Sequence, residues 1–351
     1  MVILIFIIVL AILVLAHEWG HFIVAKKNGL IVEEFGFGFP PKLFSFKKGE
    51  TLYSINLLPL GGFVKILGED GSETDNHRSF ASRSVGTRSL ITVGGVTMNF
   101  ILAALLLTVG FYIGTPQAVD GELGAAVKNI QIQIVAVSHN SPAENVGLKL
   151  GDSIRNFDEV VGLQDFVNKS KGKEITLDVR RGEENLEVKI IPRINPPEGE
   201  GALGIALAKT GIVSYPWHKS IWLGIKSAFV LIWAIAKGFA ELIKNLIISG
   251  RVPQDISGPV GIAVLTGQAA QLGFIYLLNL VALISLNLVV LNILPFPALD
   301  GGRLLFLGIE KIKGSKVNPK IENAIHGAGL AILLFLVILI TYRDILKFLK
   351  S

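Results

Sequence analysis

Long apolar runs separated by polar stretches dominate the chain. Three runs are long enough to cross a bilayer, since about twenty apolar residues span its hydrocarbon core. They are Val2–Ala25, Leu90–Ile113 and Phe274–Leu294. A fourth run, Gly327–Thr341, is shorter and continues towards Leu346. The pattern predicts a polytopic α-helical membrane protein with about four transmembrane helices.

A further apolar stretch, Trp217–Ser249, is interrupted by charged residues at helical spacing. These residues are Lys219, Lys226, Lys237, Glu241 and Lys244. On a helix they form one charged stripe, which suits a helix lying in the membrane interface. The alternative is a fifth spanning helix whose lysine stripe faces protein. We expect an amphipathic interfacial helix over 215–250.

The composition agrees with a membrane protein. Hydrophobic residues make up 51% of the chain, the mean hydropathy is +0.57, and 17% of residues are charged, against about 25% in soluble domains. The net charge of +5 is spread among acidic residues, which fits anionic lipid head groups better than nucleic acid. The chain has no cysteine, so a metal would have to be held by His, Asp or Glu.

Two polar regions alternate in the manner of β-strands. Residues 119–209 contain "IQIQIVAV", "EITLDVR" and "LEVKIIP" and are expected to form a soluble domain. This domain separates a first membrane part, residues 1–115, from a second, residues 251–351. The stretch "KLFSFKKGETLYSINLLPLGGFVKI" predicts strands around a Lys48-Gly49-Glu50 turn. Its last residues are either a substrate-binding edge strand, which offers free N–H and C=O groups to an extended peptide, or part of a simple cytoplasmic hairpin.

Three ionisable residues stand at the end of the first apolar run. His17 and His21 share one face of a helix, and Glu18 lies beside them. This is H-E-x-x-H, in which two imidazoles hold Zn²⁺ and the glutamate is the general base. The alternative is a hydrogen-bonded histidine pair at a helix end. In a membrane that alternative weakens, because buried ionisable residues are costly and usually functional.

A catalytic zinc needs a third protein ligand, and Asp300 is the acidic residue at membrane depth in the other spans. It lies in "NILPFPALDGG", where Pro295 and Pro297 prevent a regular helix. Non-helical backbone at that depth has to be buried in protein or line a cavity. The alternative is a turn that ends a helix before a cytoplasmic loop.

With these motifs in place, the chain resembles the site-2 protease family of intramembrane zinc metalloproteases, in its bacterial regulator of sigma-E protease branch. The matching segments are "HEWGH", "NILPFPALDGG", "PLGGFVK" (Pro59–Lys65) and "ISGPVGIA" (Ile256–Ala263). The resemblance extends nearly from end to end. Val96 stands where relatives often carry proline, which bears on local helix geometry.

The resemblance implies a role for each matched residue. His17, His21 and Asp300 would bind Zn²⁺, and Glu18 would take a proton from the metal-bound water and pass it to the departing amine. Residues expected to contact the substrate are Asn292, Pro295, Pro297, Asn99 and the membrane-associated β element at Gly61, Gly62, Phe63 and Val64.

The soluble domain resembles a single α+β PDZ domain. "SPAENVGLKLGDSI" (Ser141–Ile154) matches its helix-and-turn signature, and "GALGI" (Gly201–Ile205) is a candidate loop for a peptide C-terminus. Such a domain either binds peptides or excludes substrates with bulky outer domains. His326 lies outside these motifs and is interpreted as a surface or boundary histidine.

The expected function is cleavage of transmembrane segments of single-pass membrane proteins, by resemblance anti-sigma factors or remnant signal peptides. The alternatives are a catalytically inactive PDZ-containing membrane receptor and a metal transporter. Nine Lys/Arg in Lys26–Leu90 and five in Arg303–Lys320 predict that both loops are cytoplasmic. We therefore expect a multi-pass protein of the cytoplasmic membrane, with the PDZ domain outside and the active site towards the cytoplasm.

Overall fold

The computed structural model describes residues 1–118, 127–182, 184–197, 199–250 and 258–350. The chain forms two compact units. The first contains Met1–Leu107, Ile225–Gly267 and Asn279–Ser351, and the second contains Thr108–Gly224 and Gln268–Leu278. The expected starts of the soluble domain at residue 119 and of the second membrane part at residue 251 lie outside the described residues, as do the first two residues of the segment Ile256–Ala263.

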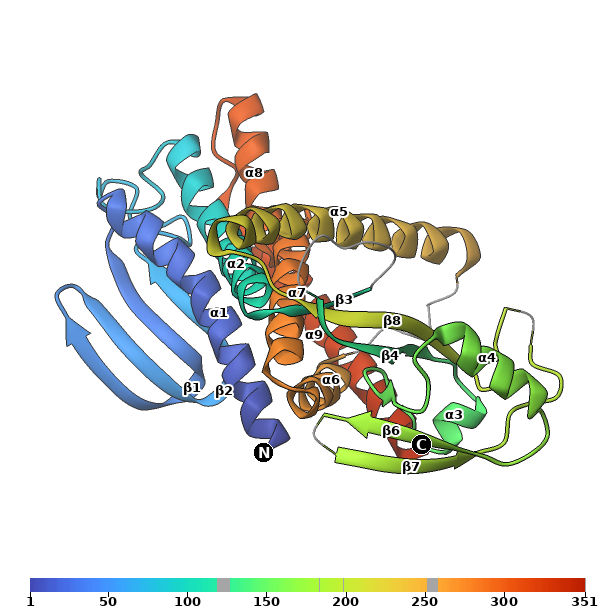
Figure 1. Cartoon of the computed structure of the whole chain (residues 1–351). Helices are drawn as coiled ribbons and strands as arrows, with labels where there is room; N and C mark the ends of the chain where they lie inside the picture. The colour runs from blue at the N-terminus through green and yellow to red at the C-terminus, as the bar shows by residue number, and fades with distance from the viewer. Residues whose placement is uncertain (119–126, 183, 198, 251–257, 351) are drawn as a thin grey trace. The chain divides into compact units, whose positions relative to one another are not determined.

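Five of the described helices are long and apolar enough to cross a membrane (Figure 1). They are α1 (Val2–Lys27), α2 (Val85–Ile113), α5 (Trp217–Ser249), α7 (Phe274–Ile293) and α9 (Pro319–Lys350). The last helix begins eight residues before the expected Gly327, so the shorter apolar run is one part of a continuous helix. Four spans with an interfacial α5 stay a prediction, because length and composition do not separate the two arrangements.

Glycine allows α1 and α2 to approach closely in the first unit. A Cβ at Gly20 would overlap the carbonyl group of Gly94. Small residues are what let the backbones of two membrane helices touch. This contact brings the first third of α2 against the second and third turns from the end of α1, where the histidines lie.

The two long strands follow α1 and fold back on themselves. The strand β1 (Val32–Lys48) pairs with β2 (Thr51–Ile66), with Lys48 opposite Thr51 as the turn pattern predicts. Phe35 is paired with both Tyr53 and Val64, so β1 lies between the two ends of β2. Within the described part of the chain, residues 62–66 pair with β1 on one side and with no strand on the other, as an edge segment requires. A cluster of buried side chains joins this edge to α1 and α2: Phe22, Ala25, Leu30, Val32, Val64, Ile66, Phe80 and Ile91.

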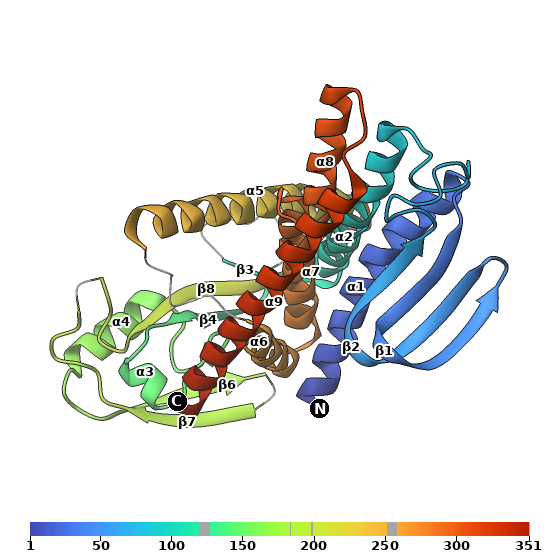
Figure 2. The ribbon, with the colours of Figure 1, turned by 180° about the vertical axis from the view of Figure 1, so that it is seen from behind.

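Two shorter helices contribute to the first unit, α6 with its residues up to Gly267. α6 (Pro259–Leu272) begins where the Asp344 carboxylate of α9 accepts hydrogen bonds from the Gly258 and Gly261 amides at 2.9 and 2.7 Å. This caps the amide-rich end of α6. α8 (Asp300–Lys313) and the start of α9 form a helical hairpin (Figure 2).

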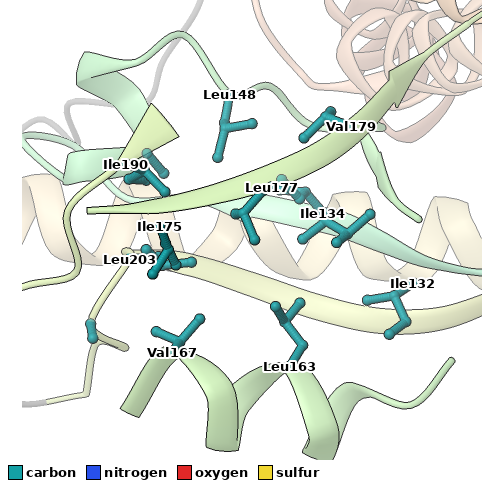
Figure 3. Close-up of a cluster of buried hydrophobic side chains, with 13 residues drawn as sticks. Ile132, Ile134, Leu148, Leu163, Val167, Ile175, Leu177, Val179, Ile190 and Leu203 are labelled. Atoms are coloured by element: carbon teal, nitrogen blue, oxygen red, sulfur yellow. The ribbon is translucent and has the colours of Figure 1, made fainter. Parts of the chain in front are cut away.

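The second unit is built on a six-stranded sheet of order β3-β8-β4-β5-β6-β7. Its strands are β3 (Thr115–Ala118), β4 (Val127–Val137), β5 (Ser153–Ile154), β6 (Ile175–Arg181), β7 (Glu184–Ile190) and β8 (Ile205–Val213), and its short helices are α3 (Pro142–Asn145) and α4 (Val160–Lys169). Leu163 and Val167 of α4 point towards Leu177 and Ile134 of the sheet (Figure 3). This unit therefore has a hydrophobic core of its own.

Candidate metal centre and catalytic cavity

Three potential metal ligands meet between α1 and the first residue of α8. The Oδ2 atom of Asp300 lies 3.2 Å from His17 Nε2 and 3.4 Å from His21 Nε2, and the two Nε2 atoms are 3.2 Å apart. Four ligands arranged tetrahedrally at about 2.0–2.2 Å from Zn²⁺ are separated by about 3.3–3.6 Å. The spacing of these three atoms therefore fits one zinc ion, with a fourth position left for water.

The state of Asp300 supports the same interpretation. Its Oδ2 atom is buried, and among the described residues no donor forms a hydrogen bond with it. A buried carboxylate oxygen without a donor is costly. A cation bound between this oxygen and the two imidazoles would remove that cost.

Hydrogen bonds behind the rings orient both histidines. His21 Nδ1 lies 2.9 Å from the Ile91 carbonyl oxygen, which only accepts, so Nδ1 donates and Nε2 keeps its lone pair for a metal. Asn99 Nδ2 lies 3.5 Å from His17 Nδ1, while Asn99 Oδ1 is buried and has no hydrogen-bond partner among the described residues. Exchanging the two amide atoms by a half-turn lets Oδ1 accept from His17 Nδ1–H, and both histidines then present Nε2 to the same point.

Glycines make room for the ligand set. A Cβ at Gly95 of α2 would overlap the rings of His17 and His21. On the opposite side, a Cβ at Gly301 or Gly302 would overlap carbonyl groups of the preceding loop, residues 293–296. The two glycines after Asp300 thus let this loop close over the first turn of α8, which places the carboxylate.

Gly95→Ala is expected to weaken metal binding, because the added methyl group pushes both imidazoles from their positions. A matched control is Gly86→Ala in the same helix, where the nearest atom to a new Cβ is the Ser84 hydroxyl at 4.0 Å. Alanine favours a helix by about 1 kcal/mol over glycine, so both changes should leave α2 intact. Metal analysis of the purified variants should find zinc reduced in Gly95→Ala only. Equal zinc in both variants would show that the space at Gly95 is not needed for the two histidines to bind the metal.

A cavity of about 380 Å³ opens in front of the three ligands. Glu18 lines it beside His17 and His21, and Asn292 lines it from the end of α7. The edge of β2 supplies Gly62, Phe63 and Val64. A Cβ at Gly62 would lie 2.8 Å from Val14 Cγ1 and 3.3 Å from Glu18 Cγ, so glycine is what allows the strand to approach the glutamate.

The remaining predicted substrate contacts are placed differently. Gly61, Pro295 and Pro297 are not among the described residues that line this cavity. Asn99 is fully buried and lies next to His17, a candidate metal ligand. Pro297 packs instead against α9, where a Cβ at Gly329 would lie 2.5 Å from Pro297 Cβ.

Three residues outside the sequence motifs lie at or next to this cavity. Glu69 and Arg303 line the cavity and form an ion pair with each other. His326 is more than a boundary residue: its Nδ1 accepts a 2.8 Å hydrogen bond from the amide of Ala298, whose φ of +77° is unusual for alanine. Only the spacing of Arg303, three residues after Asp300 on a helix, offered a sequence signal.

The chain is similar to known peptidases along most of its length. The model of Peptidase family M50 matches residues 5–336. A putative zinc metalloprotease of Clostridium perfringens is 35% identical over 340 residues, which cover 95% of each chain. The regulator of sigma-W protease RasP of Bacillus subtilis is 30% identical over 431 aligned positions, covering 97% of each chain.

Proposed function

Because this chain belongs to Peptidase family M50, we propose that it is a multi-pass intramembrane zinc endopeptidase. The observation that carries the proposal is the meeting of His17, His21 and Asp300 within 3.4 Å of one another, next to Glu18 in one cavity. The zinc metalloprotease names of its relatives support the choice of metal. A catalytically inactive receptor would not need three metal-binding side chains together with a general base in one cavity.

The chemistry divides between the metal and the glutamate. When bound, Zn²⁺ lowers the pKa of a coordinated water and polarises the scissile carbonyl. The Glu18 carboxylate accepts the proton of the attacking water and then donates it to the nitrogen of the departing amine. Ile91 and Asn99 keep the imidazoles oriented through this exchange, since the backbone carbonyl and the amide hold their Nδ1 atoms.

The edge of β2 is the proposed substrate platform. A transmembrane helix hides its carbonyl groups in hydrogen bonds, so the scissile segment has to unwind and find new partners. Residues 62–66 have a free strand edge and line the cavity at Gly62, Phe63 and Val64. They can pair with an extended peptide directly in front of Glu18. Asn292, on the other wall, is the proposed side-chain contact.

The proposed substrates are transmembrane segments of single-pass proteins, such as anti-sigma factors or remnant signal peptides. One relative is named a regulator of sigma-W protease, which supports a regulatory membrane substrate. The nine and five basic residues of the two loops favour a cytoplasmic-side active site in the cytoplasmic membrane, with the second unit outside. Labelling of single cysteines placed in either loop of this cysteine-free chain tests that sidedness.

The second unit is the proposed PDZ domain, spanning about 119–209. A pocket of about 180 Å³ lies between α4 and β8 and is lined by Leu163, Val167, Leu203 and Ile205, next to Gly201. This is the groove in which an extended peptide could add to β8, with its C-terminus at Gly201–Ile205. Titration with C-terminal peptides, against the same peptides amidated, tests this role.

Removal of zinc tests the catalytic proposal. The protein in lipid vesicles should cut a tagged single-pass substrate within its membrane segment. A strong chelator should stop the reaction, and Zn²⁺ should restore it, because no cysteine or serine nucleophile takes part in the proposed mechanism. Mass spectrometry of the products locates the cut. Unchanged cleavage by chelated, metal-free protein would overturn the proposal.

A further inference from the structure

The carboxylate of Glu69 joins the substrate strand to the helix that carries Asp300. One oxygen, Oε2, accepts a 3.4 Å hydrogen bond from the amide of Ile66, the last residue of β2. The other oxygen, Oε1, forms the ion pair with Arg303 of α8. A single side chain therefore contacts the end of the proposed platform and the element that supplies the third metal ligand.

Both ends of this connection are close to the reacting groups. Arg303 follows Asp300 by three residues, so the two lie on one face of α8. Glu69 follows Ile66 by three residues, within a tight turn in which Gly68 has a φ of +71°. The two charged residues also line three adjoining cavities, of about 280, 380 and 300 Å³, the second being the catalytic one. The pair thus lies where the strand, the metal helix and these cavities meet.

We propose that Glu69 and Arg303 are positioning residues that fix the register between the substrate strand and the metal, and so select the peptide bond that is cut. The inference rests on the proposed function. A strand that presents an extended peptide repeats about every 3.3 Å, so a small shift of β2 relative to Asp300 moves a neighbouring bond in front of Glu18. A direct link between the two elements removes that freedom.

The pair is partly open to solvent. The side chains of Arg303 and Glu69 are 42% and 21% exposed, so water screens part of their attraction and lowers what the pair contributes to stability. A second pair, Arg88 with Glu310, also ties α8 to its surroundings, and its side chains are only 10% and 13% exposed. Arg88 lies in α2, and this second pair does not touch β2. It is a matched control, because its loss should disturb folding more and register less.

The experiment compares Glu69→Gln and Arg303→Gln with the double variant Arg88→Gln/Glu310→Gln, which leaves no unpaired charge. Each protein is reconstituted in vesicles with one tagged single-pass substrate. The readouts are kcat and KM, zinc content, thermal stability, and the cut bonds identified by mass spectrometry of the products. Arg303→Lys keeps the charge and tests for rescue.

We expect both Glu69→Gln and Arg303→Gln to lower kcat by about 10- to 100-fold, as for other residues that orient catalytic groups indirectly. Zinc content and KM should stay near the wild-type values, and cleavage should spread to neighbouring bonds. Arg303→Lys should cut mainly the wild-type bond. The control pair should lower thermal stability while its products keep the single wild-type bond.

A single unchanged bond in the Glu69→Gln products would overturn the inference. A fall in kcat that matches a loss of zinc would also overturn it, because the pair would then act only by holding Asp300. The inference also fails if the control variant cuts neighbouring bonds to the same extent. The effect would then come from a general loosening of α8 and not from the link to β2. If wild-type protein cuts no substrate, the proposed function fails, and that result is distinct from all of these.

Discussion

Glu18→Gln should bind zinc like the wild type and lose cleavage by about 10²- to 10⁴-fold, the usual contribution of a general base. Glutamine has the same size and fills the same place between His17 and Gly62, but its amide cannot take a proton from water. The three proposed metal ligands are unchanged, so the metal content should be unchanged as well. Cleavage rates in vesicles and metal analysis of the same preparation measure both quantities.

A control carboxylate separates this effect from a change in charge. Glu241 of α5 is 63% exposed, pairs with Lys237 and does not line the catalytic cavity. Glu241→Gln should therefore cut the substrate at the wild-type rate. Cleavage by Glu18→Gln at the same rate as Glu241→Gln would show that Glu18 is not the base.

Asp300→Ala should lose most of its zinc. One of three proposed protein ligands is removed, so the fall in zinc affinity should exceed the roughly 10- to 100-fold that the loss of an outer hydrogen-bond partner causes. His17 and His21 would remain, with their Nε2 atoms 3.2 Å apart. Two imidazoles alone leave two coordination positions of the ion accessible to a chelator. Competition with a chelator of known affinity, followed by metal analysis, gives the change in affinity.

Asp344→Asn is the matched control for this change. Asp344 is a buried aspartate of the same unit that caps α6 and does not touch the ligand set. Its loss disturbs the packing of α9 but removes no ligand, so zinc affinity should be kept. Equal zinc in Asp300→Ala and wild type would remove Asp300 from the ligand set.

The helices and turns were predictable because each depends on residues that are close together in the sequence. The spacing of His17 and His21 places them on one face of any helix, and the apolar run around them calls for a helix in a membrane. The turn at Gly49 follows from its own residues, since glycine adopts its φ of +63° without strain. The boundary of α9 was predicted too late, because polar residues near its start hide the helix from a hydropathy pattern.

The roles of single residues outside the motifs were less accessible. The contact of Asn99 with His17 was not predicted, because it depends on how α2 packs against α1. The contact of His326 with Ala298 depends on how α9 packs on the loop before Asp300. Neither contact follows from a periodic pattern in the sequence, so neither could be predicted from residue spacing.

The sequence by itself determined that the chain has several long apolar helices, that two histidines share a helix face with a glutamate beside them, and to which family the chain belongs. Only the tertiary structure decided that Asp300 comes within 3.4 Å of both imidazoles and that Glu69 contacts Ile66 and Arg303 together. The reason is physical: side-chain periodicity follows from the geometry of one helix or strand. The meeting of distant segments depends on packing at contacts such as Gly20 with Gly94 and Gly95 with the histidines, which no local pattern encodes.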